Sequence, residues 1–288
     1  MPTRQDSTGR RQTFADIFHN EVTAWLVLAV SLAVTALGWY VAETYVEKRA
    51  EERFEFEVVD ARDRIVARMQ DYEQVLRSGV ALFATLGREA QRDEWRTFVE
   101  GLQIERNFPG IQGMGYAVML TPDRLDAHVA AVRAEGFPAY TVKPDGPRDA
   151  YSAIVYLEPF DWRNQRAFGF DMYSNAMRRR AMDHARDTGE AAVSGRVTLV
   201  QETREDVQAG FLVYLPVYRG GYRPADIEQR RQTLRGFVYS PFRMADLMAG
   251  ILGSEAPEVD FALFDGTAAP SDDNLLYDSA PNASRGLA

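Results

Sequence analysis

Side chains that could perform catalysis are few in this sequence, and most are spaced too widely to act together. The three histidines, His19, His128 and His184, have no second His or Cys at metal-ligand spacing. There is no cysteine, which excludes disulfides, cysteine–zinc sites and thiol nucleophiles. The G-x-S-x-G motif of serine hydrolases and the phosphate-binding G-x-x-x-x-G-K-[ST] motif are also absent. We therefore expect no catalytic site, no metal and no cofactor.

Two carboxylates, Glu158 and Asp161, stand close together and could form the acid pair of a hydrolase. They flank Pro159-Phe160, which predicts a turn. A hydrolase would require both carboxyls to face one cleft at a catalytic separation, which spacing in the sequence does not establish. Solvated loop carboxylates are the simpler interpretation, and an exported hydrolase is our third hypothesis.

A third carboxylate, Asp171, ends the apolar run AFGFD (167–171), where burial would require a hydrogen-bonding partner. Many aromatic residues lie in the same two regions: Tyr156, Phe160, Phe168, Phe170, Tyr173, Phe211 and Tyr214. A buried carboxylate among aromatic rings can orient a small ligand that bears NH or OH donors. Alternatively, the aromatic rings form the core and Asp171 caps a turn.

The segment after Asp171 predicts a helix over 175–187, capped by Ser174 or Asn175 and stopped by Gly189. Three successive arginines (178–180) begin it, and Asp183 follows at a spacing that allows pairs with Arg179 and Arg180. A solvated, salt-paired helix face is one interpretation of this basic run, and nucleic-acid binding is the other. The formal net charge of −9 argues against nucleic acid.

Residues 22–42 carry no charge and are long enough to cross a bilayer as a helix. Trp25, Trp39 and Tyr40 lie near the ends, where aromatic residues gather at membrane interfaces. A cleaved signal peptide has a shorter apolar core of roughly 7–15 residues, so we expect an uncleaved anchor. Basic residues lie on both sides of the span, arginines before it and Lys48 and Arg49 after it. The positive-inside rule therefore hardly distinguishes the two orientations. A short tail (1–21) in the cytoplasm and a folded domain outside the cell membrane fit best.

Helical periodicity continues after the span and predicts a stalk helix over 43–88. Apolar or small residues recur every three or four positions at 58, 61, 65, 69, 72, 76, 79, 83 and 86. We expect this stripe to pack on its own domain and on the same helix of a second copy, forming a homodimer.

Strands and helices alternate in the rest of the chain. Strands are predicted at 113–120, 138–144, 151–159, 195–201, 210–218, 234–240 and 258–266, with helices near 93–104, 122–135, 175–187 and 241–252. This order predicts an α+β fold with helices packed on a largely antiparallel sheet. The polar connection near 219–233 suggests a larger unit (90–222) and a smaller one (223–288).

Three stretches carry an ordered series of motifs: NFPGIQGMGYA (107–117), YLEPFDWRNQRAFGFDMYSNAMRRRAMDHARDTGEAAVSGRVTLVQE (156–202) and GFLVYLPVY (210–218). Together they resemble the CHASE domain, an extracytoplasmic sensor of histidine kinases and nucleotide cyclases, and the likeness covers most of residues 50–250. The resemblance implies a stalk helix carrying two PAS-like α/β units, of which the membrane-distal one (90–222) binds a small molecule.

The resemblance also implies roles for individual residues. Asp171 matches the ligand-contacting acid of cytokinin-binding members, and Thr188, next to Gly189, matches a structurally sensitive threonine at the helix end. The strands 197–202 and 210–218 would line the pocket. The resulting set of ligand-binding candidates is Asp171, Tyr156, Phe160, Phe170, Thr198, Leu199, Gln201 and Tyr214.

The family usually continues into a second membrane span and a cytoplasmic output domain, a histidine kinase or a diguanylate cyclase. We expect both to lie outside this sequence, so that unit 223–288 is truncated before the second span. The sequence thus predicts a membrane-anchored periplasmic sensor for a small molecule. The alternative from a different class is a membrane-tethered protein–protein interaction module without a small-molecule pocket.

Overall fold

The computed structural model describes residues 21–203, 207–253 and 259–281. A long N-terminal helix precedes an antiparallel sheet domain, which confirms the predicted α+β class. The chain forms two compact units, Met1–Val59 and Asp60–Ala288. Of the predicted cytoplasmic tail (1–21), residues 1–20 lie outside the part that is described.

The predicted membrane span and stalk belong to one helix, α1 (Glu21–Leu86). Within the described residues it is the one helix that is long and apolar enough to cross a membrane. The side chains of its most apolar stretch are exposed, including Trp25, Leu32 and Trp39. Exposed apolar surface over such a length is compatible with a single-span membrane protein.

From Asp60 onward α1 belongs to the folded domain and packs on its sheet. Tyr72, Leu76 and Phe83 are buried in the core, and Ile65 and Met69 pack against it. These residues come from the predicted apolar stripe, whose core-facing role is confirmed over this part of the helix.

The domain is built on one five-stranded antiparallel sheet in the order β2-β1-β5-β4-β3. The strands are β1 (Met114–Leu120), β2 (Tyr151–Glu158), β3 (Ala192–Val193), β4 (Gly210–Tyr218) and β5 (Leu234–Arg243). Every residue of β2 and β4 is buried. A sheet of this kind must be covered on both faces.

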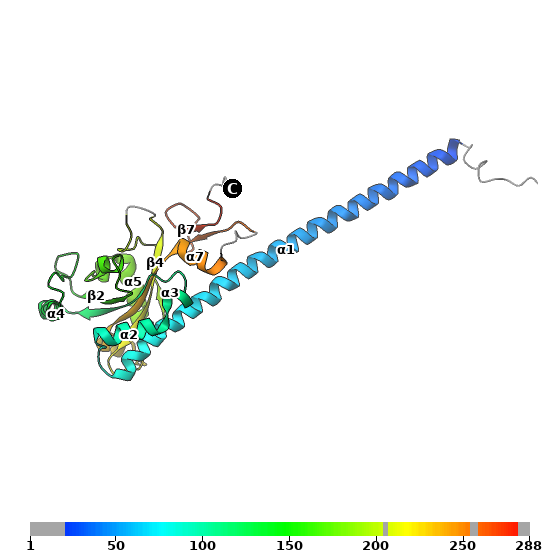
Figure 1. The fold of residues 1–288 in the computed structure, drawn as a ribbon. Helices are drawn as coiled ribbons and strands as arrows, with labels where there is room; N and C mark the ends of the chain where they lie inside the picture. The colour runs from blue at the N-terminus through cyan, green and yellow to red at the C-terminus, as the bar shows by residue number, and fades with distance from the viewer. Residues whose placement is uncertain (1–20, 204–206, 254–258, 282–288) are drawn as a thin grey trace, which may run out of the picture. The chain divides into compact units, whose positions relative to one another are not determined.

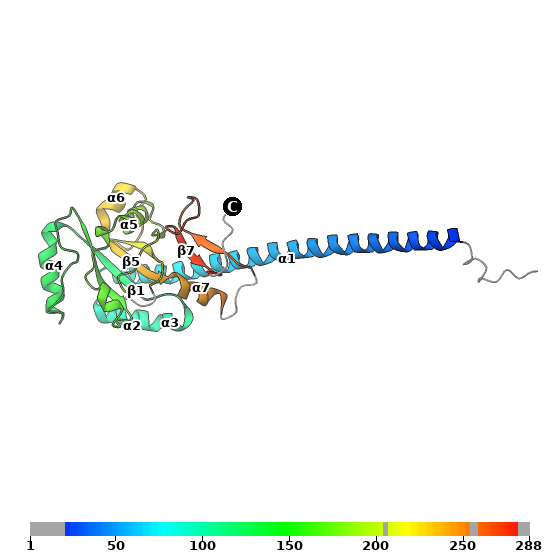
Figure 2. The same ribbon diagram turned by 90° about the horizontal axis from the view of Figure 1, so that it is seen from above.

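Different helices cover the two faces (Figures 1 and 2). The end of α1 and the helix α2 (Arg92–Leu102) contribute to one core cluster, and α5 (Ala176–Thr188) contributes to the other. Side chains alternate along β1 accordingly, with Tyr116 in the α1 layer and Ala117 in the α5 layer. Figure 2 shows α5 and α6 on one side of the sheet and α2 and α3 on the other.

The remaining elements connect these layers. They are α3 (Ile104–Asn107), α4 (Pro122–Ala134), the short 3-10 helices η2 (Asn164–Ala167) and η3 (Met172–Ser174), α6 (Ile227–Thr233), α7 (Met244–Leu252), β6 (Ala262–Phe264) and β7 (Leu275–Asp278). The last two strands form a separate two-stranded sheet.

Two predicted strands are wrong. In 138–144, only Lys143 forms an isolated bridge, to Phe170, because prolines stand at both ends of the segment. In 195–201, only Val197 is bridged, to Gly210. The ladder from β3 is interrupted because the Ser194 hydroxyl, rather than a backbone carbonyl, accepts the Leu212 N–H at 2.9 Å.

The predicted boundary between units 90–222 and 223–288 also needs correction. β5 lies in the middle of the main sheet, so the sheet extends well beyond residue 222. The strand continues through Pro241, where we expected a helix to begin, because the Pro241 carbonyl accepts the Gln112 N–H at 3.1 Å. The helix α7 then starts at Met244.

We predict that Gly79→Val destabilises the domain by about 1–3 kcal/mol, because overpacking at a closely packed helix–sheet contact displaces its neighbours. A Cβ at Gly79 would collide with Met114 and lie 3.1 Å from Val238 Cγ1. Thermal unfolding measures the change. Gly101→Val, in α2 with no atom within 4 Å of its Cβ position, is the control and should have little effect. Equal effects of the two substitutions would contradict this packing account.

Candidate functional site

Asp171 lies at the start of η3 and is completely buried. Its Oδ1 accepts the N–H of Ser152 at 2.7 Å and the N–H of Tyr173 at 3.0 Å. These bonds cap η3 and attach the loop to the beginning of β2. The carboxylate therefore has the turn-capping role that the sequence left open.

The second oxygen of this carboxylate has unused hydrogen-bonding capacity. Oδ2 is buried and has no hydrogen-bond partner among the described residues, although Arg148 Nη1 lies 3.5 Å away as an ion-pair neighbour. Burial raises the pKa of Asp171, against the opposing effects of the two N–H donors and of Arg148. A donor brought to Oδ2 would favour the ionised form. Asp171 can thus cap the turn with one oxygen and accept a ligand N–H or O–H with the other.

Arg178 lies on the face of α5 that packs on the sheet and is 4% exposed. Its Nη2 donates to the Thr198 carbonyl at 3.1 Å, and its guanidinium lies 4.8 Å from the centroid of the Phe170 ring. Its Nε has no hydrogen-bond partner among the described residues. Burial lowers the pKa of this guanidinium, but an arginine stays charged in proteins, so the α5 layer contains a buried cation.

Two tyrosines of the sheet lie in the same layer as Arg178. Tyr214 on β4 and Tyr239 on β5 are fully buried, and their ring centroids are 6.3 Å apart. Neither hydroxyl has a hydrogen-bond partner in the part of the chain that the structure describes. Tyr239 pairs across the sheet with Gly115, where any Cβ would meet its ring, so Gly115 makes room for it. Buried hydroxyls without partners are uncommon in folded proteins.

The structure brings together only part of the predicted ligand-binding set. Phe170, Leu199 and Tyr214 contribute to the α5 layer. The side chain of Thr198 is exposed, and only its carbonyl faces Arg178. Gln201 is buried and donates weakly to Asn164 at 3.4 Å.

Tyr156 and Phe160 lie apart from this group, on the α1 side of the sheet. The Tyr156 hydroxyl donates to the Ala90 carbonyl at 2.9 Å, and its ring faces Trp95. Phe160 packs edge-on against Phe137 and Phe168. Tyr156 acts as core, because adjacent positions of a strand face opposite sides of its sheet. Phe160 follows β2 and is only partly buried.

Arg178 and Tyr239 were missed from the sequence, although a signal for Arg178 was present. Arg178 occupies the same helical stripe as Ala181, Met182 and Ala185, which are all buried. An arginine in an apolar stripe marks a buried cation, whereas Arg179 and Arg180 lie on the exposed face. The predicted pairing of those two arginines with Asp183 is wrong, since Asp183 pairs with Arg186 at 2.8 Å.

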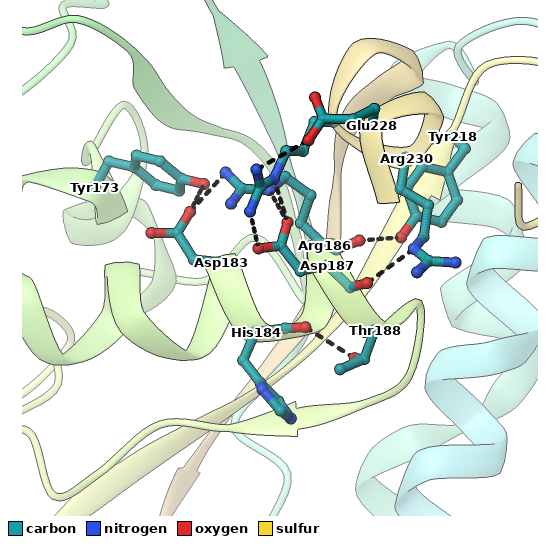
Figure 3. Close-up of polar contacts among 10 residues, drawn as sticks. Tyr173, Asp183, His184, Arg186, Asp187, Thr188, Tyr218, Glu228 and Arg230 are labelled. Carbon is teal, nitrogen blue, oxygen red and sulfur yellow. Dashed lines mark hydrogen bonds and ion pairs between the residues drawn. The ribbon is translucent and has the colours of Figure 1, made fainter. Parts of the chain in front are cut away.

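The C-terminal end of α5 is held by polar contacts (Figure 3). The Thr188 hydroxyl donates to the His184 carbonyl at 2.8 Å and accepts the Glu190 N–H at 3.2 Å. Gly189 ends the helix in the left-handed conformation, as predicted. Asp187 pairs with Arg186 and Arg231, and these hydrogen bonds lower the pKa of Asp187.

Glu190, immediately after this helix end, connects the α5 layer to α1. Its carboxylate pairs with Arg77 of α1 at 2.9 Å and with Arg223. Arg77 also pairs with Glu73 one turn earlier in α1. The end of α5 is thus tied directly to α1 within the folded domain.

The carboxylates proposed for a hydrolase have local structural partners. Glu158 accepts the Phe160 N–H at 3.0 Å, and Asp161 accepts the Asn164 N–H at 2.8 Å to start η2. Burial raises the pKa of Glu158. Within the described ranges, no group of three or more His, Asp or Glu side chains could hold a metal ion.

Comparisons with known proteins agree with the resemblance found in the sequence. A family model described as the CHASE domain matches residues 88–277. The hybrid signal transduction histidine kinase A of Dictyostelium discoideum is 27% identical over 146 residues, which cover 49% of this chain and 7% of that protein. An extracellular ligand binding receptor from Desulfohalobium retbaense DSM5692 shares 12% identity with a TM-score of 0.42, covering 69% of this chain and 26% of that one.

The matched region contains the whole main sheet together with α5, so the domain is a sensory module of signalling proteins. The chain belongs to the CHASE domain family. It spans only a small part of the histidine kinase that it matches.

We predict that Asp171→Ala destabilises the domain by about 2–4 kcal/mol, because it leaves the buried N–H groups of Ser152 and Tyr173 without an acceptor. Asp171→Asn retains an acceptor oxygen for both N–H groups and should cost much less. Thermal unfolding of the two variants measures the difference. Equal stability of both variants would exclude the capping role.

Proposed function

We propose that this chain is the extracytoplasmic sensory part of a membrane receptor that binds a small molecule between α5 and the sheet. One observation carries the proposal: Asp171 Oδ2, Arg178 Nε and the hydroxyls of Tyr214 and Tyr239 are all buried without hydrogen-bond partners among the described residues. Leaving such groups unpaired costs roughly 1–3 kcal/mol each. A ligand with complementary polar groups would remove that cost, which favours a small-molecule sensor over a protein–protein interaction module.

The membrane part of the proposal rests on the apolar stretch of α1. In this proposal residues 22–42 anchor the chain in the cell membrane, with the sensor domain in the periplasm. The output, a histidine kinase or a diguanylate cyclase, would lie in another part of the receptor. The sensory role of the family and the histidine kinase relative support such an output.

The proposed homodimer rests on the helix that follows the span. Phe54, Phe56 and Val59 of α1 are 55%, 67% and 50% exposed within the N-terminal unit. Apolar side chains on a helix of this kind are usually covered by a partner. A second copy of the same helix is the partner we propose, which would give a parallel dimer.

We propose a boundary later in the chain than residue 222. The ligand-binding unit would be one PAS-like unit that includes β5 and extends to α7. The second, smaller unit would then be limited to the region of β6 and β7.

Signal transfer is proposed to run from α5 to α1 through Glu190. Ligand binding in the α5 layer would shift the end of α5 at Thr188 and Gly189, and Glu190 would pass the shift to Arg77. The contact is short and joins the two helices directly, which is the physical support for this route.

Native mass spectrometry tests the binding proposal. The full chain, in detergent micelles and incubated with a cell metabolite extract, should have the mass of a dimer with a retained small molecule. Asp171→Asn should retain it at least about tenfold more weakly, because a hydrogen bond to a charged acceptor is lost. Asp149→Asn, in an exposed loop, is the matched control. Retention that is equal in all three proteins, or absent from the wild type, would refute the proposal.

A double-mutant cycle tests the proposed route to α1. Arg77→Gln and Glu190→Gln should show a coupling of about 0.2–1 kcal/mol in unfolding experiments, decreasing with added salt, as for other exposed pairs. Glu228→Gln combined with Arg77→Gln is the control and should show none. A zero coupling between Arg77 and Glu190 would remove Glu190 from the route.

A further inference from the structure

Two arginines are buried among the described residues of this domain, and their electrostatic surroundings differ. Arg243, 5% exposed, pairs with Glu202 Oε1 at 2.8 Å and with Asp246 Oδ2 at 2.8 Å. Arg178, 4% exposed, has no carboxylate within 4.0 Å among residues 21–203, 207–253 and 259–281. A buried charge is costly unless it is paired. Within the described ranges, one buried arginine is therefore neutralised and the charge of the other is not.

The partners that Arg178 does have are both neutral. One hydrogen bond goes to the Thr198 carbonyl, and the Phe170 ring provides a cation–π contact. The hydrogen bond to Thr198 uses Nη2, so Nε still has no acceptor among the described residues, and the aromatic ring provides no acceptor atom. The arginine cannot relieve its burial by losing a proton, because its pKa stays far above neutrality. An anion from outside the described chain would provide the missing charge.

The neighbouring hydroxyls add donors to the same place. Burial raises the pKa of both Tyr214 and Tyr239, so at neutral pH each retains its O–H and can donate. Arg178 lies on the face of α5 that packs on β4, the strand of Tyr214, and the Tyr239 ring centroid lies 6.3 Å from that of Tyr214. A cation, two hydroxyl donors and a free N–H form a receptor for a negatively charged oxygen group.

We propose that the ligand of the α5 site bears a carboxylate, which Arg178, Tyr214 and Tyr239 bind. This inference rests on the proposed small-molecule function and specifies the chemistry of its ligand. The carboxylate would accept from Arg178 Nε and from the two hydroxyls, while Asp171 Oδ2 remains available for an N–H or O–H elsewhere on the ligand.

The surroundings favour an organic carboxylate over a small inorganic anion. Phe170, Leu199, Leu212 and Phe237 contribute apolar surface to the same layer. An inorganic ion would lose its water without gaining apolar contacts, whereas the hydrocarbon part of an organic acid would gain them.

Ligand entry requires residues 195–203 to be displaced. Within the described backbone contacts only Val197 of this stretch exchanges hydrogen bonds with β4, at Gly210. Buried side chains also hold the segment, since Val197 and Leu199 pack in the α5 layer and Glu202 pairs with Arg243.

Thermal shift assays on the full chain in detergent test the proposal with defined probes. The carboxylates are acetate, pyruvate, benzoate and phenylacetate, and the neutral controls are acetamide, benzamide and phenylacetamide. Sodium chloride at equal ionic strength is the inorganic arm. At least one carboxylate should raise the melting temperature, while its amide and chloride should not.

Variants identify the groups that bind. Arg178→Met should lower the affinity for the stabilising carboxylate at least about tenfold, because the charge that pairs with it is lost. The same substitution should not lower the stability of the ligand-free domain. Arg180→Met, on the exposed face of α5, is the control and should bind normally. If Arg178→Met does not fold, Tyr214→Phe provides the same test, since removing an unpartnered hydroxyl preserves packing.

Each other outcome overturns the inference. If amides stabilise the chain as well as carboxylates do, or if Arg178→Met binds them unchanged, the ligand is not recognised through a carboxylate, although small-molecule binding stands. If sodium chloride raises the melting temperature and no carboxylate does, the site binds an inorganic ion. If no probe stabilises the wild type, the carboxylate site is rejected, and mass spectrometry with the metabolite extract decides the proposed function separately.

Discussion

The burial of the central sheet on both faces is the constraint on which this domain depends. All residues of β2 and β4 are buried, so each face needs a helical layer. The end of α1 and α2 cover one face, and α5 covers the other. The part of α1 that forms this core continues, in the same helix, the candidate membrane span.

Both layers contain buried polar atoms without hydrogen-bond partners among the described residues. In the α1 layer these are Trp95 Nε1 and the Tyr116 hydroxyl. In the α5 layer they are the hydroxyls of Tyr214 and Tyr239 and Nε of Arg178. The α5 layer differs in that its unpaired groups include a buried cation. In our proposal this cation and the hydroxyls beside it bind the ligand.

Asp171 shows why the structural and ligand-binding interpretations of one residue need not exclude each other. One oxygen holds two backbone N–H groups, and the other has no hydrogen bond. Thr188, in the last turn of α5, links that turn to Glu190 through its hydroxyl. Asp171 thus fixes the 3-10 helix that precedes α5, and Thr188 fixes the end of α5 itself.

Local patterns in the sequence determined the α+β class, the long N-terminal helix, β1, β2, β4, and α5 with its stop at Gly189, because periodicity and caps act over a few residues. They also indicated the family through the motifs around Asp171. Only the tertiary structure decided that β5 belongs to the main sheet and that Tyr156 and Tyr214 face opposite layers. It also decided that no described carboxylate pairs with the buried Arg178. Strand order and the partners of a buried charge depend on residues far apart in the chain, which local patterns do not encode.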